Sequence, residues 1–289
     1  EPQTLVIDIM NVERHLISRK FIIEEGLQDL LDDVLPNTNK AIRENPQHAL
    51  GASIAVNQQA FIRSICAERP QSFSLDLLRV YKSIVLSNFR FGAGSEPFSE
   101  KFNGEVISFT PQRKTAFMSV DDWKLAYDAC MLLRDMDGLR FLATIPEEVF
   151  EKSNNRASAF DLAYYRFMAH FFNGGKNTGA LLIDAMEEGG KPQSNPTRTK
   201  FVDLVRIPEL QLMEDFVLGD SAAFNNDLYD ALVSHKKYYG TSENGFATPG
   251  WIALPLLSAC TLASDGKKFP IEVESEYLPK WLILGEGIK

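Results

Sequence analysis

From residue 119 onward, apolar residues recur at the spacing of amphipathic helices. In SVDDWKLAYDACMLL, one apolar face consists of Trp123, Ala126, Tyr127, Cys130 and Leu133. Ser119 and Asp122 stand three residues apart ahead of this face, a variant of the capping box that satisfies free backbone N–H groups. The pattern predicts a helix that begins after Ser119, and a shorter helix over LRFLATI that ends at Pro146.

The sequence of helix, small polar turn and helix returns twice further along the chain. FDLAYYRFMAHFF breaks at NGG and resumes as ALLIDAMEE, and PELQLMEDFVL breaks at GD and resumes as SAAFNNDLYDALVSHKKYYG. Aligned at the breaks, Leu133, Phe172 and Phe216 correspond, at intervals of 39 and 44 residues, within the range of α-solenoid repeats. Antiparallel pairs in a helix bundle give the same pattern. We predict a mainly α fold, a solenoid-like or bundle-like array of antiparallel helix pairs with at most one short β-hairpin.

The first 118 residues are less regular. Helices are predicted over residues 12–35, 49–68 and 75–91, separated by the polar turns PNTNK and RPQS. EVISFTPQRKTAFMS then offers two short apolar stretches around a polar turn, which indicates a hairpin near residues 105–118. We expect an N-terminal helical part, 1–118, and a C-terminal helical-repeat part, 119–289, packed as one continuous unit.

Composition places the chain among soluble globular proteins. Apolar residues make up 45% and charged residues 24%, and no run of eighteen apolar residues could span a bilayer. The three cysteines form no CxxC pair and are odd in number, which argues against a disulfide framework or a zinc site and fits a reducing cytoplasm.

The net charge of −9 is unevenly distributed along the chain. Residues 1–118 carry 13 basic and 14 acidic side chains, whereas residues 119–289 carry 17 and 25. An acidic surface repels nucleic acid and anionic lipid, because phosphate binding needs a basic patch. The charge therefore favours a basic protein partner, with no nucleic acid and no membrane.

Catalytic patterns are absent from the sequence. His15, His48, His170 and His235 are too far apart for a metal pair on one helix, and FGAGSEP lacks the third glycine or the lysine of a phosphate-binding loop. Five pairs of adjacent acids, Asp121–Asp122 among them, point in different directions on a helix and are interpreted as solvated faces. Cys66 is interpreted as a small buried hydrophobe within a helix. We expect no catalytic, cofactor or metal site, and hence a binding protein.

The stretch IEVESEYLPKWL alternates apolar and acidic residues. In an extended conformation, Glu272, Glu274 and Glu276 share one side, while Ile271, Val273, Ser275 and Tyr277 share the other and can dock on the helices. One interpretation is an edge segment whose charges discourage strand pairing. The other is an acidic ladder that meets basic residues of a partner, aided by Tyr277 and Trp281, residue types enriched at interface hot spots.

Four segments carry a resemblance to a known family. DDWKLAYDACMLLRD, FNNDLYDALVSHKKYYG, GWIALPLLSACTLASDG and VESEYLPKW, in this order between Ser119 and Leu282, resemble the bacterial immunity protein 49 family, antidotes of polymorphic toxin systems. Of the positions that match, we interpret the following as packing residues: Trp123, Phe224, His235, Tyr238, Ser275, Tyr277 and Pro279.

The resemblance implies a helical, non-enzymatic protein in the bacterial cytoplasm that binds and blocks a secreted toxin domain and needs no cofactor. We expect the toxin domain to be basic, and its predicted contacts are Glu272, Glu274, Glu276, Tyr277, Trp281, Glu187 and Glu188. A solenoid-like scaffold that binds an extended peptide is the alternative function, and an enzyme whose catalytic residues converge only in the fold is a third. The sequence leaves the oligomeric state open.

Overall fold

The computed structural model describes residues 10–17, 20–112 and 118–288, and confirms the predicted fold class. Of these residues, 67% are helical, and the described part of the chain contains a single two-stranded antiparallel sheet. Within the part of the chain that the structure describes, no helix is long and apolar enough to cross a membrane.

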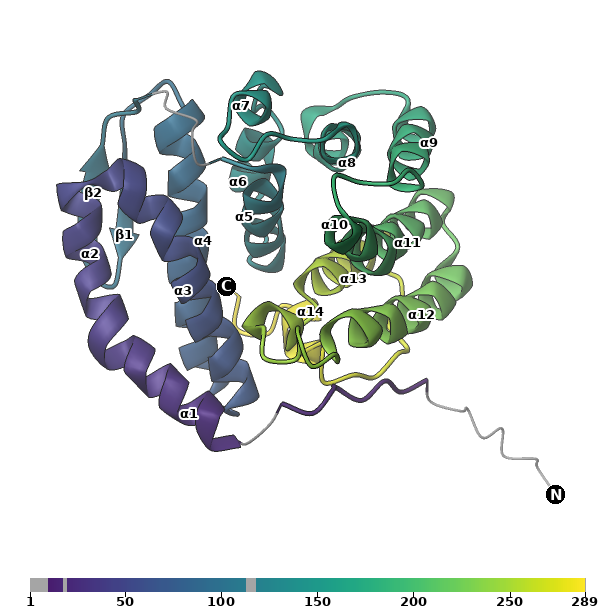
Figure 1. The fold of residues 1–289 in the computed structure, drawn as a ribbon, viewed down its shortest axis with the longest axis horizontal. Coiled ribbons are helices and arrows are strands. Elements are labelled where there is room, and N and C mark those ends of the chain that lie inside the picture. Colours follow the sequence, from purple (N-terminus) through teal and green to yellow (C-terminus); the bar gives the residue numbers. More distant parts are fainter. Residues whose placement is uncertain (1–9, 18–19, 113–117, 289) are drawn as a thin grey trace.

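The N-terminal helices lie together at the left of Figure 1. Their bounds are α1 (Lys20–Asp29), α2 (Leu35–Glu44), α3 (Pro46–Cys66) and α4 (Gln71–Ala93), and a π-helical turn, Leu30–Val34, joins α1 to α2. The long helices α3 and α4 pack against each other, and each carries fully buried side chains, Phe61 on α3 and Phe89 on α4. Helices α1 and α2 both pack against α3.

Two details of this region differ from the prediction. The predicted helix over residues 12–35 begins only at Lys20, and residues 10–17 are extended. PNTNK, predicted as a turn, lies within α2. Pro36 closely follows the π-helical turn, in which the Leu35 N–H donates to the Leu30 carbonyl, so the helical backbone continues through this proline.

The β-hairpin lies upstream of its predicted position. Strand β1 (Phe98–Phe102) pairs with β2 (Glu105–Phe109), with Phe98 opposite Phe109. Asn103 and Gly104 form the turn and both have positive φ, 46° and 89°, as a two-residue hairpin turn of type I′ requires. The first predicted stretch, which begins at Glu105, is thus strand β2, but its partner strand precedes it in the sequence instead of following it. The second predicted stretch falls largely on residues 113–117, outside the described residues.

The three predicted helix pairs are present. They are α5 (Val120–Leu132) with α6 (Met136–Leu142), α8 (Ala159–Asn173) with α9 (Thr178–Gly189), and α11 (Ile207–Leu218) with α12 (Ser221–Tyr239). The predicted capping box of Ser119 and Asp122 is confirmed at the start of α5. Gly174 and Gly219 end α8 and α11 with φ of 69° and 83°, the left-handed conformation that lets the chain reverse at low steric cost.

Shorter elements complete the C-terminal part. They are α7 (Glu148–Glu151), α10 (Pro196–Phe201), a π-helical turn (Val202–Arg206), a 3-10 turn (Thr248–Gly250), α13 (Leu254–Lys267) and α14 (Lys280–Ile283). Helix α13 packs on both α5 and α11, and α4 packs on α5. Buried apolar residues on both sides of residue 118 form one contiguous cluster, from Val12 to Ile283. The division at residue 118 stays a hypothesis.

Candidate functional site

The side chains of residues 271–277 alternate between the core and solvent, as predicted. The backbone is extended only over residues 271–275, since the Leu278 N–H donates to the Ser275 carbonyl (3.0 Å) and closes a turn. Val273 and Tyr277 are buried. The exposed side chains are Glu272, Glu274 and Glu276, which we call the acidic ladder. The Glu272 N–H donates to Asn225 Oδ1 on α12 (2.8 Å), and the Ala253 N–H just before α13 donates to the Tyr277 carbonyl (3.1 Å). The helices therefore hold the backbone that carries the ladder.

Residues 10–17, which we call the strap, lie along this segment and pass beneath α12 and α14 in Figure 1. The Glu274 N–H donates to the Met10 carbonyl (2.9 Å), and the Val12 N–H donates to the Glu274 carbonyl (3.0 Å), a short parallel pairing. Ser275 Oγ donates to the Val12 carbonyl (2.6 Å). One side of the predicted edge segment is therefore already paired within the chain.

Tyr277 joins two histidines that are far apart in the sequence. Its hydroxyl accepts from the His15 N–H (2.9 Å) and lies 2.7 Å from His15 Nδ1, while its ring centroid is 4.9 Å from that of His235. His235 Nε2 lies 2.9 Å from the Gly250 carbonyl oxygen. Burial lowers the pKa of His235 to about 4 and also lowers the pKa of His15. Both rings are neutral at pH 7, and a partner could reach Tyr277 only after the strap moved.

Removing the Tyr277 hydroxyl is expected to loosen the strap while the core stays folded. In Tyr277→Phe the ring still fills its site, but the buried His15 N–H loses its acceptor, which costs about 1–3 kcal/mol of stability in the bound strap. Hydrogen exchange at the Val12 and His15 amides should accelerate by about tenfold or more, whereas exchange in α12 should not change. Identical exchange rates at Val12 in the two proteins would show that this hydroxyl does not hold the strap.

A cavity of about 560 Å³ opens between the strap, the C-terminal end of α3 and residues 271–283. Its apolar wall consists of Ile65, Ile271, Val273, Leu278, Trp281 and Ile283. Its charged lining consists of Arg14, Glu68, Glu274, Glu276 and Lys280. Among the predicted contact residues, the fold thus brings Glu274, Glu276 and Trp281 together around one cavity. Glu272 is exposed on the same ladder, outside the lining.

The basic residues of the cavity already contact its acids. Arg14 donates from its main-chain N–H to Glu276 Oε2 (3.2 Å) and from its guanidinium to the Glu276 carbonyl, and Lys280 Nζ lies 3.9 Å from Glu274 Oε1. These contacts are exposed to solvent, so each contributes little to stability. Cys66 lies in the wall, half-buried, and is the last residue of α3 where the prediction put it in the middle of a helix. Burial raises the pKa of its thiol to about 11, so it is protonated at pH 7.

The remaining predicted contacts, Glu187 and Glu188, lie elsewhere. Both belong to the last turn of α9, at the upper right of Figure 1, whereas α14 lies just below the centre of the picture. Glu187 is exposed, and Glu188 pairs with Lys191 at 2.6 Å. The structure does not join these two glutamates to the cavity, and they would need a separate contact with a partner.

A group of buried charges inside the C-terminal part was missed by sequence reasoning. We call it the charge network, and its members are Lys124 and Asp128 on α5, Arg206 at the end of a π-helical turn, and Glu209 on α11. Lys124 Nζ contacts both acids, lying 2.8 Å from Glu209 Oε1. Tyr164 donates its hydroxyl proton to Glu209 Oε2 (2.7 Å). All four charged side chains are at most 6% exposed, so we interpret the network as structural.

The interpretation of the adjacent acids as solvated faces does not hold for Asp121, which pairs with two arginines. Its carboxylate accepts from Arg206 (3.0 Å) and Arg198 (2.9 Å). Burial acts to raise the pKa of Asp121, but the two guanidinium groups outweigh it and hold that pKa below its usual value. These arginines stand 85 and 77 residues away in the sequence, so no local pattern could have revealed the pairing.

No group of three or more His, Cys, Asp or Glu side chains in residues 10–17, 20–112 and 118–288 is placed to hold a metal ion. The positions interpreted as packing residues are mostly buried, with Trp123 and Phe224 fully so.

Comparison with known proteins gives one match. A family model described as Immunity protein 49 matches residues 76–282. The match begins within α4, earlier than the Ser119 limit of the resemblance, and ends just after Trp281. It therefore includes the acidic ladder and leaves out the strap and helices α1 to α3. No curated protein and no solved structure matches the chain.

Proposed function

Because the chain belongs to the immunity protein 49 family, we propose that it binds a cognate toxin domain and neutralises it by covering the active site. The toxin is a secreted protein domain with a basic cleft, and the immunity protein protects the cytoplasm of the cell that makes it. It acts by occupying the cleft and performs no reaction of its own. The family match is the observation that carries this proposal.

The charge and shape of the ladder face support the proposed mode of binding. Three exposed carboxylates stand at alternate positions on a segment that α12 and α13 hold in place. Beside them, half-buried Trp281 lines an apolar cavity with a charged rim, the arrangement found at interface hot spots. A basic cleft approaching this face would be attracted from a distance, which speeds capture. Fast capture suits an antidote.

Co-expression with the toxin tests the function itself. The candidate toxin is the C-terminal domain of a large secreted protein encoded directly upstream of this chain. We expect that domain to be lethal when expressed alone, and harmless when expressed with the chain. A toxin domain from an unrelated system is the control, against which the chain should give no protection. Death in the presence of well-expressed immunity protein would overturn the proposal.

Charge reversal of the acidic ladder should slow association with that toxin domain. The triple variant Glu272→Lys, Glu274→Lys and Glu276→Lys replaces attraction by repulsion, so we expect the association rate constant at low salt to fall by about tenfold or more. The rate should also lose most of its dependence on ionic strength. Stopped-flow measurements at several salt concentrations provide the readout.

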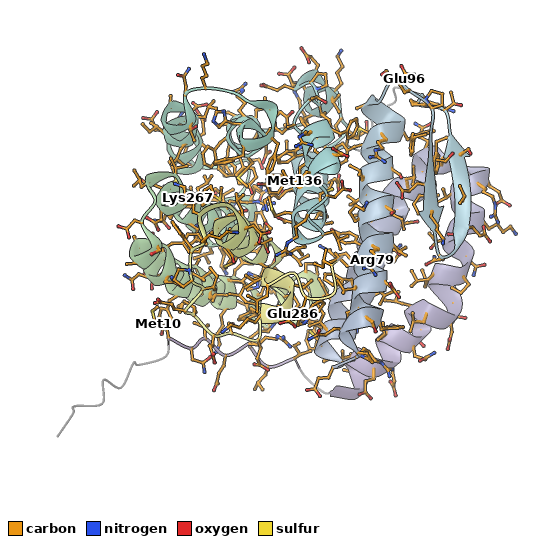
Figure 2. All side chains as sticks on the ribbon, turned by 180° about the vertical axis from the view of Figure 1, so that it is seen from behind. Met10, Arg79, Glu96, Met136, Lys267 and Glu286 are labelled. Atoms are coloured by element: carbon orange, nitrogen blue, oxygen red, sulfur yellow. The ribbon has the colours of Figure 1, made fainter. Side chains whose placement is uncertain are left out.

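A matched triple variant controls for net charge. Glu44→Lys, Glu96→Lys and Glu148→Lys change the charge equally at exposed positions away from the ladder. Figure 2 shows Glu96 at the opposite end of the molecule from Met10 in the strap. This control should bind almost as the unmodified protein does. If both triple variants slowed binding equally, only overall charge would matter, and the ladder would not be the docking face. Glu187→Lys with Glu188→Lys then tests whether the interface extends to α9.

A further inference from the structure

Arg134 has a backbone conformation that arginine rarely adopts. It lies just beyond the end of α5 with φ of 56°, in the left-handed region. The Arg134 N–H donates to the Met131 carbonyl (3.0 Å), and the Asp135 N–H donates to the Cys130 carbonyl (2.9 Å). These two bonds form a Schellman motif, in which the left-handed residue is usually glycine because a Cβ atom costs free energy there. Backbone strain of this kind persists where the side chain has a role that offsets it.

The Arg134 side chain reaches the C-terminal end of α14. Nη1 donates to the Leu282 carbonyl (2.7 Å), and Nη2 donates to the Ile283 carbonyl (2.6 Å). At this end of a helix the main-chain oxygens lack partners inside the helix, and the helix dipole attracts a cation. Nε donates to Asp265 on α13 (2.9 Å), and Nη1 also donates to the Leu132 carbonyl (2.8 Å). One side chain therefore joins the ends of α5, α13 and α14.

These contacts use the geometry that distinguishes arginine from lysine. A guanidinium group is planar and holds five N–H donors in a fixed fork, whereas the donors of lysine all sit on one nitrogen. The fork can therefore bond two neighbouring carbonyls and a carboxylate at once. Gly285 leaves room for it, because a Cβ atom at that position would lie 3.2 Å from Arg134 Cζ.

The exposed residue that these bonds hold in place is Trp281. It is half-buried on α14, and its carbonyl accepts from the Glu286 N–H (2.9 Å) in the turn that closes the helix. Leu282 and Ile283 are buried and attach α14 to the core. A helix of four residues has no stability of its own, so its orientation depends on tertiary contacts such as those of Arg134.

We propose that Arg134 is a positioning residue of the docking face: its guanidinium fixes α14 so that Trp281 meets the toxin domain in one orientation. The proposal deepens the proposed function and rests on it in one respect, namely that Trp281 contacts the toxin. A side chain that is already ordered loses less entropy on binding, which slows dissociation of the complex. The hold of Arg134 on α14 can be measured without any toxin.

Two variants of Arg134 separate its charge, its backbone strain and its fork. Arg134→Lys keeps the charge and the strain but loses the fork, and Arg134→Gly removes the strain together with the side chain. In both we expect hydrogen exchange at the Glu286 amide, measured by NMR, to accelerate by about tenfold or more. Unchanged exchange in both variants would overturn the proposal. If Arg134→Lys alone exchanged like the unmodified protein, a cation would be sufficient and the role given to the fork would be wrong.

Lys268 provides a matched control for the removal of strain. It ends α13 with φ of 59°, so it is also a residue other than glycine in the left-handed region. Lys268→Gly removes the same kind of strain and leaves the bonds to Leu282 and Ile283 in place. We expect unchanged exchange at Glu286. Acceleration equal to that in Arg134→Gly would show that Glu286 responds to any change at a helix end, and would contradict the proposal.

Binding kinetics connect Arg134 to recognition of the toxin domain. Arg134→Lys preserves the net charge, so the association rate constant should not change, whereas dissociation should be about tenfold faster. Trp281→Ala already lacks the contact, so adding Arg134→Lys to it should have little further effect on dissociation. An equal loss in both backgrounds would mean that Arg134 does not act through Trp281. Failure of the unmodified chain to protect cells overturns the proposed function alone, because exchange at Glu286 reports the hold on α14 without the toxin.

Discussion

Replacing Lys124 by methionine is expected to lower the free energy of unfolding by about 3–5 kcal/mol, because it leaves Asp128 buried without a cation and Glu209 with Arg206 alone. Lys124 is 0% exposed, and its ammonium group contacts both Asp128 and Glu209. Methionine preserves most of the volume, so the loss reports on charge more than on packing. Urea unfolding followed by circular dichroism provides the measurement.

The chain contains a matched control for this variant. Lys40 and Glu44 on α2 are four residues apart, like Lys124 and Asp128, but their side chains are 70% and 66% exposed. Because solvent screens such a pair, Lys40→Met should change the stability by less than about 0.5 kcal/mol. Similar losses in the two variants would contradict the idea that burial makes the Lys124 contacts important.

The Lys124→Met loss should also depend on pH. Burial already raises the pKa of Asp128, with Lys124 as the main opposing influence. Without the lysine, the folded protein favours protonated Asp128 even more strongly. A group with a raised pKa in the folded state contributes stability at low pH and loses it as the pH rises. The difference between variant and original protein should therefore be larger at pH 8 than at pH 5.

Acid is expected to destabilise the protein through His235, by about 3 kcal/mol. The pKa of this histidine is about 4 in the folded state and 6.5 in an unfolded chain, so the unfolded state binds the proton first. Stability from His235 is complete above pH 6.5 and decreases as the pH falls towards 4. The shift of His15 has the same sign and adds to the loss.

Comparison with His235→Gln isolates this contribution from that of other groups. Burial raises the pKa of Asp215 to about 6, and the charge of Asp227 adds to this shift. Protonated Asp215 therefore stabilises the fold at low pH, and this contribution is lost as the pH rises through 6. The pH dependence from Asp215 is opposite in sign to that from His235. Glutamine cannot titrate, so the stability advantage of the original protein over His235→Gln should shrink by about 3 kcal/mol between pH 7 and 4. Parallel stability curves for the two proteins over that range would contradict the prediction.

The charge network and the two histidines, His15 and His235, both contact elements that hold the ladder segment, residues 271–277. Ser258 on α13 donates its hydroxyl proton to Asp128, so the network is connected to the helix that precedes the ladder segment. His15 and His235 enclose Tyr277 at the other end of that segment. A docking surface keeps its shape only if the elements beneath it are fixed. We therefore expect low pH to reduce both the stability of the fold and the binding of the toxin domain, with the strap loosening first.

The helix pairs of the C-terminal part were predictable because each depends on contacts close in sequence. Along α5, α8 and α12, successive residues of the apolar face are about one helical turn apart, and the capping residues and glycines stand directly beside the helix ends. The same holds for the alternation of residues 271–277. The hairpin differs from its predicted position because Asn103–Gly104, a stronger turn signal than the longer polar stretch that follows β2, joins β1 to β2.

By itself, the sequence determined the helical fold class, the exposed glutamates and the family segments. Only the tertiary structure decided how these parts meet: Trp281 beside Glu274 and Glu276 at a cavity, the strap along the ladder segment, and the buried cation between α5 and α11. His15 and Tyr277 bond across 262 positions of the chain. Periodicity indicates which side of an element faces inward, but it does not identify the distant residue that contacts this side. That contact depends on how whole helices pack against each other.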